Sequence, residues 1–242
     1  MKKMFMAVIA FMMTISASAQ FYIYCSDGKV IKVDSISIIA PGENVGSHNG
    51  HEYVDLGLSV KWATCNVGAT KPEEYGDYFA WGETQPKSTY NWSTYKWCNG
   101  SDNTQTKYNT NSSYGTVDNK TQLELSDDAA RANWGGSWRM PTDAELTELR
   151  ENCTWTWTTQ NYVYGYKVTS KKSGYTNNSI FLPAAGFRFD SDLNDAGNGR
   201  YWSSSLNTDY PGSAWFVYFN SYGVNRDYYL RRYGFSVRPV CQ

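Results

Sequence analysis

Short runs of alternating apolar and polar residues recur along the chain and restrict it to a fold built mainly from short strands. Side chains at alternate positions share one face of a strand, so each run predicts a strand with a buried face. Between residues 87 and 122 the chain is rich in Asn, Thr, Ser and Tyr, which predicts a long irregular excursion. The predicted strands are 54–60, 77–81, 155–158, 163–168, 180–182, 201–203, 214–219 and 235–240.

Two segments between these runs have the signals of a helix. The first begins at Ser126 as N-cap, carries two acidic residues at 127–128 in its first turn, and stops at the glycines 135–136. The second begins at Thr142, and Glu145 three positions later completes a capping box. A strand, two helices and a run of short strands describe an α+β domain, with mixed and antiparallel sheets and the last strand near the first.

The N-terminus has the features of an export signal. Lys2 and Lys3 precede an apolar run at 4–15, and the small residues 17–19 predict cleavage after Ala19. The run is too short to cross a bilayer as a stable helix, and no later segment resembles a membrane span. We therefore expect residues 1–19 to be a signal peptide, and the mature protein to be secreted, periplasmic or held at the cell surface.

The mature chain divides into a small appendage and one large domain. Residues 20–44 predict a β-hairpin, turning at the Asp27-Gly28 pair, and a polar connector. Residues 45–242 form the main domain. Loss of the two leader lysines leaves 20 basic and 23 acidic residues, a net charge of −3. This near-neutral charge argues against nucleic acid as the partner.

Five cysteines and two histidines were considered as chemical groups. An odd number of cysteines leaves at least one thiol without an intramolecular partner. Neither a zinc site nor a Ser-His-Asp triad is predicted. His48 and His51 are expected in a solvated Gly/Asn/Ser connector at 41–50, and they have no recognisable ligand spacing to the cysteines. Glu83 is a single acid, which does not make a mechanism. The sequence thus predicts no catalytic residues, no metal and no cofactor.

Several motifs in the same order resemble those of the Fibrobacter succinogenes major paralogous domain family, over about residues 52–240. They are YVDLGLSVKWATCNVGA (53–69), GDYFAWGE (76–83), WRMPTDAEL (138–146), LPAAG (182–186), YWSSS (201–205) and GFSVRPV (234–240). The resemblance implies a C-type-lectin-like fold. That family is similar to the formylglycine-generating enzymes, through RMPTDAE at 139–145 and GFSVR at 234–238. Their chemistry needs a late cysteine pair, and here no cysteine lies between Cys153 and Cys241.

A calcium site was weighed in the loop that precedes Gly197. Asp190, Asp192 and Asn194 place oxygen atoms at alternate positions, which can surround a hard cation. An EF-hand loop would need glycine where Asp195 stands, and the Glu-Pro-Asn and Trp-Asn-Asp motifs of sugar-binding lectins are absent. We therefore interpret the loop as a polar turn.

The C-terminal segment is the predicted binding surface. From residue 221 to 233 no alternation survives, and the mixture of Tyr and Arg with Asn, Ser, Asp and Gly is typical of recognition surfaces. The segment also resembles the variable region of C-type-lectin-like proteins diversified by retroelements through adenine-directed mutagenesis. The predicted ligand-binding residues are Tyr210, Tyr218, Tyr222, Asn225, Arg226, Asp227, Tyr228, Tyr229, Arg231, Arg232 and Tyr233.

Taken together, these features predict an exported, non-enzymatic protein that binds a protein or glycan ligand. Two alternatives stay open. One is a structural or adhesive component of the cell surface, and the other is an enzyme of the formylglycine-generating type.

Overall fold

Antiparallel pairing dominates the computed structural model, which describes residues 21–24, 30–33 and 45–242. The chain divides into two units, Met1–Ala40 and Pro41–Gln242. In the first unit β1 (Phe21–Tyr24) pairs antiparallel with β2 (Val30–Val33), which confirms the two strands of the predicted hairpin. The predicted turn at 27–28, the connector at 34–44 and the signal peptide at 1–19 lie outside the described residues.

The first sheet of the second unit joins the two ends of that unit. Its order is β14-β5-β4-β3, from β14 (Val240–Cys241), β5 (Lys61–Ala63), β4 (His51–Val54) and β3 (Val45–His48). The predicted pairing of the last strand near the first is confirmed. The expected solvated connector at 41–50 is wrong from residue 45 onward. Asn49 and Gly50, at φ 46° and 81°, form the tight turn between β3 and β4.

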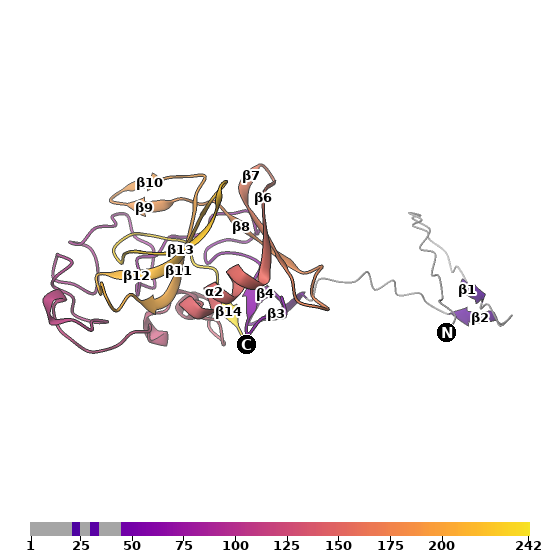
Figure 1. The fold of residues 1–242 in the computed structure, drawn as a ribbon, viewed down its shortest axis with the longest axis horizontal. Coiled ribbons are helices and arrows are strands. Elements are labelled where there is room, and N and C mark those ends of the chain that lie inside the picture. The colour runs from indigo at the N-terminus through magenta and orange to yellow at the C-terminus, as the bar shows by residue number, and fades with distance from the viewer. Residues whose placement is uncertain (1–20, 25–29, 34–44) are drawn as a thin grey trace. The chain divides into compact units, whose positions relative to one another are not determined.

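Two three-stranded antiparallel sheets contain most of the remaining strand residues (Figure 1). One consists of β6 (Cys153–Gln160), β7 (Val163–Ser170) and β8 (Ser179–Pro183). The other consists of β11 (Gly199–Leu206), β12 (Ser213–Asn220) and β13 (Gly223–Leu230), in that order. A short hairpin of β9 (Phe187–Phe189) and β10 (Asp192–Asn194) lies between them in sequence. The α+β class, with mostly antiparallel sheets, is therefore confirmed.

The two α-helices of the described chain are short. The second, α2 (Asp143–Asn152), has the predicted capping box between Thr142 and Glu145. The first, α1 (Ala129–Trp134), begins later than predicted, because residues Leu125–Asp127 form a 3-10 turn (η2) instead. Asp128, rather than Ser126, is the N-cap and accepts a hydrogen bond from the backbone N–H of Arg131 at 3.0 Å.

Three strand predictions fail in their bounds. Residues 55–60 contain no strand, although Leu56 and Val60 are buried. Residues 77–81 make one isolated bridge, between Phe79 and Phe235. In the predicted strand 235–240 only the last residue belongs to a named strand. The excursion at 87–122 is confirmed as irregular, with a 3-10 turn, η1 (Ser112–Tyr114), as its one helical element.

The core of the second unit is dense in aromatic rings. Trp62, Trp81, Trp138 and Trp202 are each at most 1% exposed. The sheet formed by β11 to β13 has core on both faces, because Phe216 is buried on one side and Phe219 on the other. On the Phe219 side, the buried Leu146 and Leu149 of α2 belong to the same apolar cluster. The sheet is therefore held from both sides.

A membrane span was also sought. Within the described residues, no helix has both the length and the apolar character to pass through a bilayer.

Candidate functional site: the surface around strand β13

Most of the predicted binding segment at 221–233 is a strand. β13 pairs with β12 from Gly223 to Leu230 and forms the edge of its sheet. Its central residues, 225–229, are exposed on both faces. An edge strand without a buried face has no apolar alternation, which explains why the sequence pattern did not predict it. We call the exposed side chains on and beside this strand the β13 surface.

One face of the β13 surface combines stacked aromatic rings with an ion pair. Tyr228 stacks on Tyr210 with ring centroids 5.4 Å apart and meets Trp215 edge-on at 5.4 Å. The Arg226 guanidinium lies 3.3 Å from the Trp215 ring centroid. Its Nε and Nη2 each donate to the Asp143 carboxylate at 2.8 Å. Asp143 is the first residue of α2, so the start of this helix fixes the exposed arginine.

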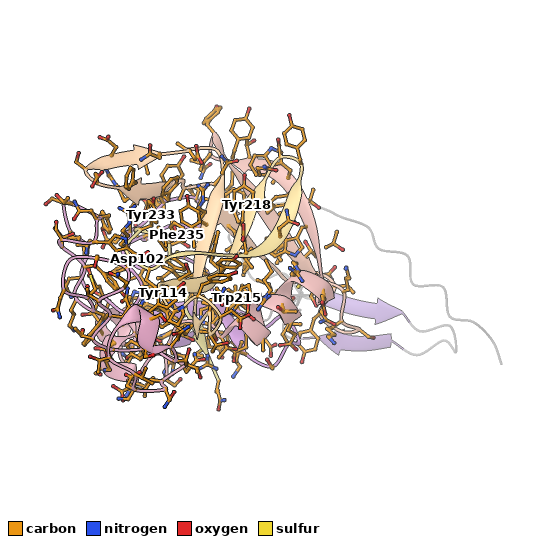
Figure 2. The ribbon with its side chains drawn as sticks, turned by 60° about the vertical axis from the view of Figure 1, so that its left-hand side comes forward. Asp102, Tyr114, Trp215, Tyr218, Tyr233 and Phe235 are labelled. Carbon is orange, nitrogen blue, oxygen red and sulfur yellow. The ribbon has the colours of Figure 1, made fainter. Side chains whose placement is uncertain are left out.

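The opposite face of β13 is more polar. Asn225 and Asp227 lie opposite Tyr218 and Phe216 of β12, which places these side chains on one face. Tyr229 follows on the same face, and its ring centroid lies 4.8 Å from that of Tyr233. Figure 2 marks Trp215 and Tyr218, the β12 residues that belong to the two opposite faces.

The Arg232 side chain adds a cation at the polar face. Its guanidinium lies over the rings of Tyr233 and Phe189, at 4.6 and 4.9 Å from the centroids. The Arg232 Nε is buried and has no hydrogen-bond partner. Arg200 of β11 lies over Tyr218 on the same face, 5.2 Å from the ring centroid.

Two of the predicted ligand-binding residues have buried side chains. Arg231 is 0% exposed and Tyr233 is 8% exposed. The Arg231 guanidinium donates to Tyr95 Oη at 2.9 Å and to main-chain carbonyls of the excursion and of Pro211. It is a structural anchor beneath the surface.

Tyr222 does not join the other predicted residues. It lies in the turn between β12 and β13 and is 95% exposed. Six residues of strand separate it from Tyr228, which corresponds to roughly 20 Å at ~3.3 Å per residue. The predicted site is therefore divided among the two faces of β13 and this distant turn.

The histidines and thiols have structural surroundings. His51 stacks on Trp134 with centroids 3.8 Å apart, and His48 Nε2 accepts a hydrogen bond from the Ser137 N–H at 2.8 Å. Cys65, Cys98, Cys153 and Cys241 are free thiols. Burial raises the pKa of the Cys153 thiol to about 11, so this thiol is protonated at neutral pH.

In the loop that precedes Gly197, acidic side chains form contacts with other residues of the protein. Asp190 accepts a hydrogen bond from the Asn91 amide at 3.0 Å, and Asp195 forms an ion pair with Arg200 at 2.9 Å. The Asp192 and Asn194 residues bound the short strand β10. Among the described residues, no three His, Cys, Asp or Glu side chains are grouped so as to hold a metal ion.

Two residues of the β13 surface were missed by the sequence reasoning. Trp215 was treated with the core alternation of 214–219, yet it is only partly buried and supports both Arg226 and Tyr228. Asp143 was seen only as a residue of the capped helix. Its proximity to β13 depends on how α2 packs on the sheet, and no local pattern contains that information.

Comparison with known proteins adds one family. A model described as a domain of unknown function (DUF8237) matches residues 155–240. The match begins in β6 and ends in β14, so it contains the whole β11–β13 sheet, together with β7, β8 and most of β6. No curated protein and no solved structure matches the chain.

Proposed function

We propose that this chain is an exported recognition protein of the C-type-lectin-like class that binds a protein or glycan ligand through the β13 surface, without covalent chemistry. The observation that carries the proposal is the contrast along one strand. Side chains 225–229 are exposed, whereas the next residue but one, Arg231, is buried and bonded to four acceptors. Exposed Tyr, Arg, Asn and Asp on a fixed backbone suit non-covalent recognition, because little conformational entropy is lost on binding.

The character of the two faces supports a ligand with both apolar and polar groups. Tyr210 and Tyr228 present a stacked aromatic pair, and Asn225 and Asp227 offer hydrogen-bonding groups on the other side of the strand. Arg226 is already paired with Asp143, so its role is to stiffen the surface as well as to contact the ligand.

The test is a ligand screen with paired variants. The mature protein is applied to a glycan array and to a displayed library of extracellular protein domains. We expect Tyr228→Ser with Tyr229→Ser to weaken binding to its best ligand at least tenfold while the Tm stays unchanged. A matched control, Leu125→Ser, alters an exposed apolar side chain in η2, away from β13 and from the hairpin turns. Equal binding by the double variant and the control would overturn the assignment of this surface.

The resemblance to retroelement-diversified proteins extends the proposal to the gene. Sequencing its 3′ end and flanking DNA across many isolates should show changes confined to adenine-derived codons of exposed β13 residues, beside a template repeat and a reverse transcriptase. The codons of Arg231 and Tyr233 should stay constant, because both side chains are buried. An invariant 3′ end would overturn diversification and leave a fixed binding protein.

A further inference from the structure

Three of the most exposed aromatic side chains lie outside the β13 surface, at two hairpin turns. Tyr162, in the β6–β7 turn, is 101% exposed, and Tyr222, in the β12–β13 turn, is 95% exposed. Tyr164, which follows on β7, is 58% exposed. We call these three tyrosines, with the Trp157 ring beneath Tyr164, the hairpin-tip surface.

The two hairpins are in contact below their turns. Tyr166 Oη of β7 donates to the Asn220 carbonyl at the end of β12, at 3.1 Å, and the Tyr166 ring meets Phe219 edge-on at 5.3 Å. Tyr164 is two residues nearer the turn than Tyr166 and lies on the same face of β7. Beyond the contact between Tyr166 and Asn220, Tyr164 therefore extends the same face of β7 on the side of the β12–β13 turn. Figure 1 shows the β6–β7 and β12–β13 hairpins rising on the same side of the unit.

The β6–β7 turn holds Tyr162 against the preference of its backbone. Asn161 and Tyr162 have φ of 46° and 66°, the left-handed region, where the second position of such a turn favours glycine. The buried Glu73 accepts hydrogen bonds from Asn161 at 2.5 Å and from Gln160 at 3.2 Å, which secures the turn. A tyrosine that breaks a local rule and is wholly exposed has no role in packing, which indicates a role in contact with a partner.

The strand and turn segments that carry these rings contain no charged side chains. Residues 152–166 and 210–225 contain no Asp, Glu, Lys or Arg, although the chain has 45 such residues in total. The carboxylate of Glu73 lies beneath the turn and is bonded by amides. These segments therefore supply no cation, and the one carboxylate beneath the turn is negative, which argues against anionic polymers and acidic membranes as the partner.

The Tyr164 ring is stacked on Trp157, which holds it in place. The Trp157 and Tyr164 rings are within 9° of parallel, with centroids 6.0 Å apart. A pyranose ring presents several C–H bonds on one face, and these positively polarised hydrogens pack on the negative face of an aromatic ring. Exposed tyrosine hydroxyls can also donate to sugar oxygens.

We propose that the hairpin-tip surface is a second binding site, separate from the β13 surface, and that its ligand is an uncharged polysaccharide. The aromatic rings stack on sugar units, and the absence of charge selects against uronic acid, sulfated and phosphorylated polymers. Because the two hairpins project together, successive sugar units of one chain can meet Tyr222 on one hairpin and Tyr162 or Tyr164 on the other.

The test is affinity electrophoresis of the mature chain in native gels that contain dextran, yeast mannan, xyloglucan or laminarin, with polygalacturonate as the charged comparison. We expect retardation by at least one neutral polymer and none by polygalacturonate. Tyr162→Gly with Tyr222→Ser should weaken retardation at least tenfold. Both side chains are fully exposed, and glycine suits the left-handed turn, so the variant should fold with unchanged Tm.

The Tyr228→Ser with Tyr229→Ser variant separates this proposal from the function of the β13 surface. It should keep full retardation by the neutral polymer. Loss of retardation in this variant, and not in the hairpin-tip variant, would overturn the second site. Retardation by none of the neutral polymers would also overturn it. Binding of the chain to phosphatidylcholine vesicles, or self-association in sedimentation, that depends on Tyr162 and Tyr222 would replace the polysaccharide by a bilayer or a second copy.

Discussion

Arg226 and Arg231 are five residues apart, yet the fold gives their guanidinium groups opposite surroundings. Arg226 is exposed and forms an ion pair with Asp143 at the surface. Arg231 is buried without a carboxylate partner, and its hydrogen bonds go to Tyr95 Oη and to three main-chain carbonyls. Two of these carbonyls belong to the excursion at 87–122, so Arg231 ties this irregular segment to the end of β13.

This difference predicts unequal effects of the same substitution. Arg231→Met leaves buried carbonyls without donors, and we expect it to lower the free energy of unfolding by about 3–5 kcal/mol. Arg226→Met removes a solvated ion pair and should cost less than about 1 kcal/mol. Urea unfolding of the two variants at neutral pH measures both values. Similar small losses would show that Arg231 does not anchor the excursion.

Composition could not separate Arg231 and Tyr233 from their exposed neighbours. In the sequence they share a short segment with Tyr228, Tyr229 and Arg232, and both residue types, Tyr and Arg, are common in binding surfaces. Their burial depends on aromatic rings far away in the chain, such as Tyr95 and Trp81 beside Arg231. The exposed residues of the β13 surface were predictable by type, whereas the anchors became visible only with the tertiary structure.

At the scale of elements, local chemistry was informative where a single turn decides the geometry. The capping box of α2 was predicted from the spacing of Thr142 and Glu145 and is confirmed. The Asn49-Gly50 turn was an equally local signal that the sequence reasoning overlooked. Strand β13 could not be found this way, because its residues face solvent on both sides and follow no apolar period.

Glu145 allows the start of α2 to be tested by pH. Burial alone would raise the pKa of Glu145, but hydrogen bonds from Arg139 and Thr142 outweigh it and hold the pKa below its usual 4.5. The ionised form thus stabilises the fold above pH 4.5, and this contribution disappears as the pH falls through the lowered pKa. Glu145→Gln should lower the free energy of unfolding by about 1.5–3 kcal/mol at pH 7.

The difference between wild type and Glu145→Gln should shrink steadily between pH 5 and pH 3, because the protonated carboxyl resembles the amide. Urea unfolding at a series of pH values measures it. Glu151→Gln is a suitable control, since Glu151 is on the same helix, exposed, and 3.9 Å from its nearest cation. A constant difference for Glu145→Gln over this range would mean that the ion pair with Arg139 does not stabilise the helix start.

On the scale of the whole second unit, the fold closes when the end of the chain returns to its first sheet. Val240 and Cys241 of β14 pair with Trp62 and Lys61 of β5, and Val240 also bridges to Arg139 before α2. The pairing of the last strand near the first was predictable from the order of the elements, but the burial of the last strand was not. Cys241 is 1% exposed, and burial raises the pKa of its thiol. The C-terminal strand β14 therefore places this thiol inside the fold.

The thiols therefore report whether the second unit opens locally or as a whole. Cys65 is partly exposed, and we expect it to react with a thiol reagent in the native protein. Cys241 and Cys153 should react only when the unit unfolds, because both are buried, Cys241 in one apolar cluster of the unit and Cys153 in another. Mass spectrometry after timed labelling in increasing urea gives the rate at each site.

If β14 closes the fold cooperatively, Cys241 and Cys153 become reactive at the same urea concentration, since no opening that exposes one would leave the other packed. Labelling of Cys241 well before Cys153 would instead mean that the C-terminal strand detaches while the β6–β8 sheet stays folded. The surfaces around β13 and the hairpin tips would then rest on a scaffold that does not need its last strand.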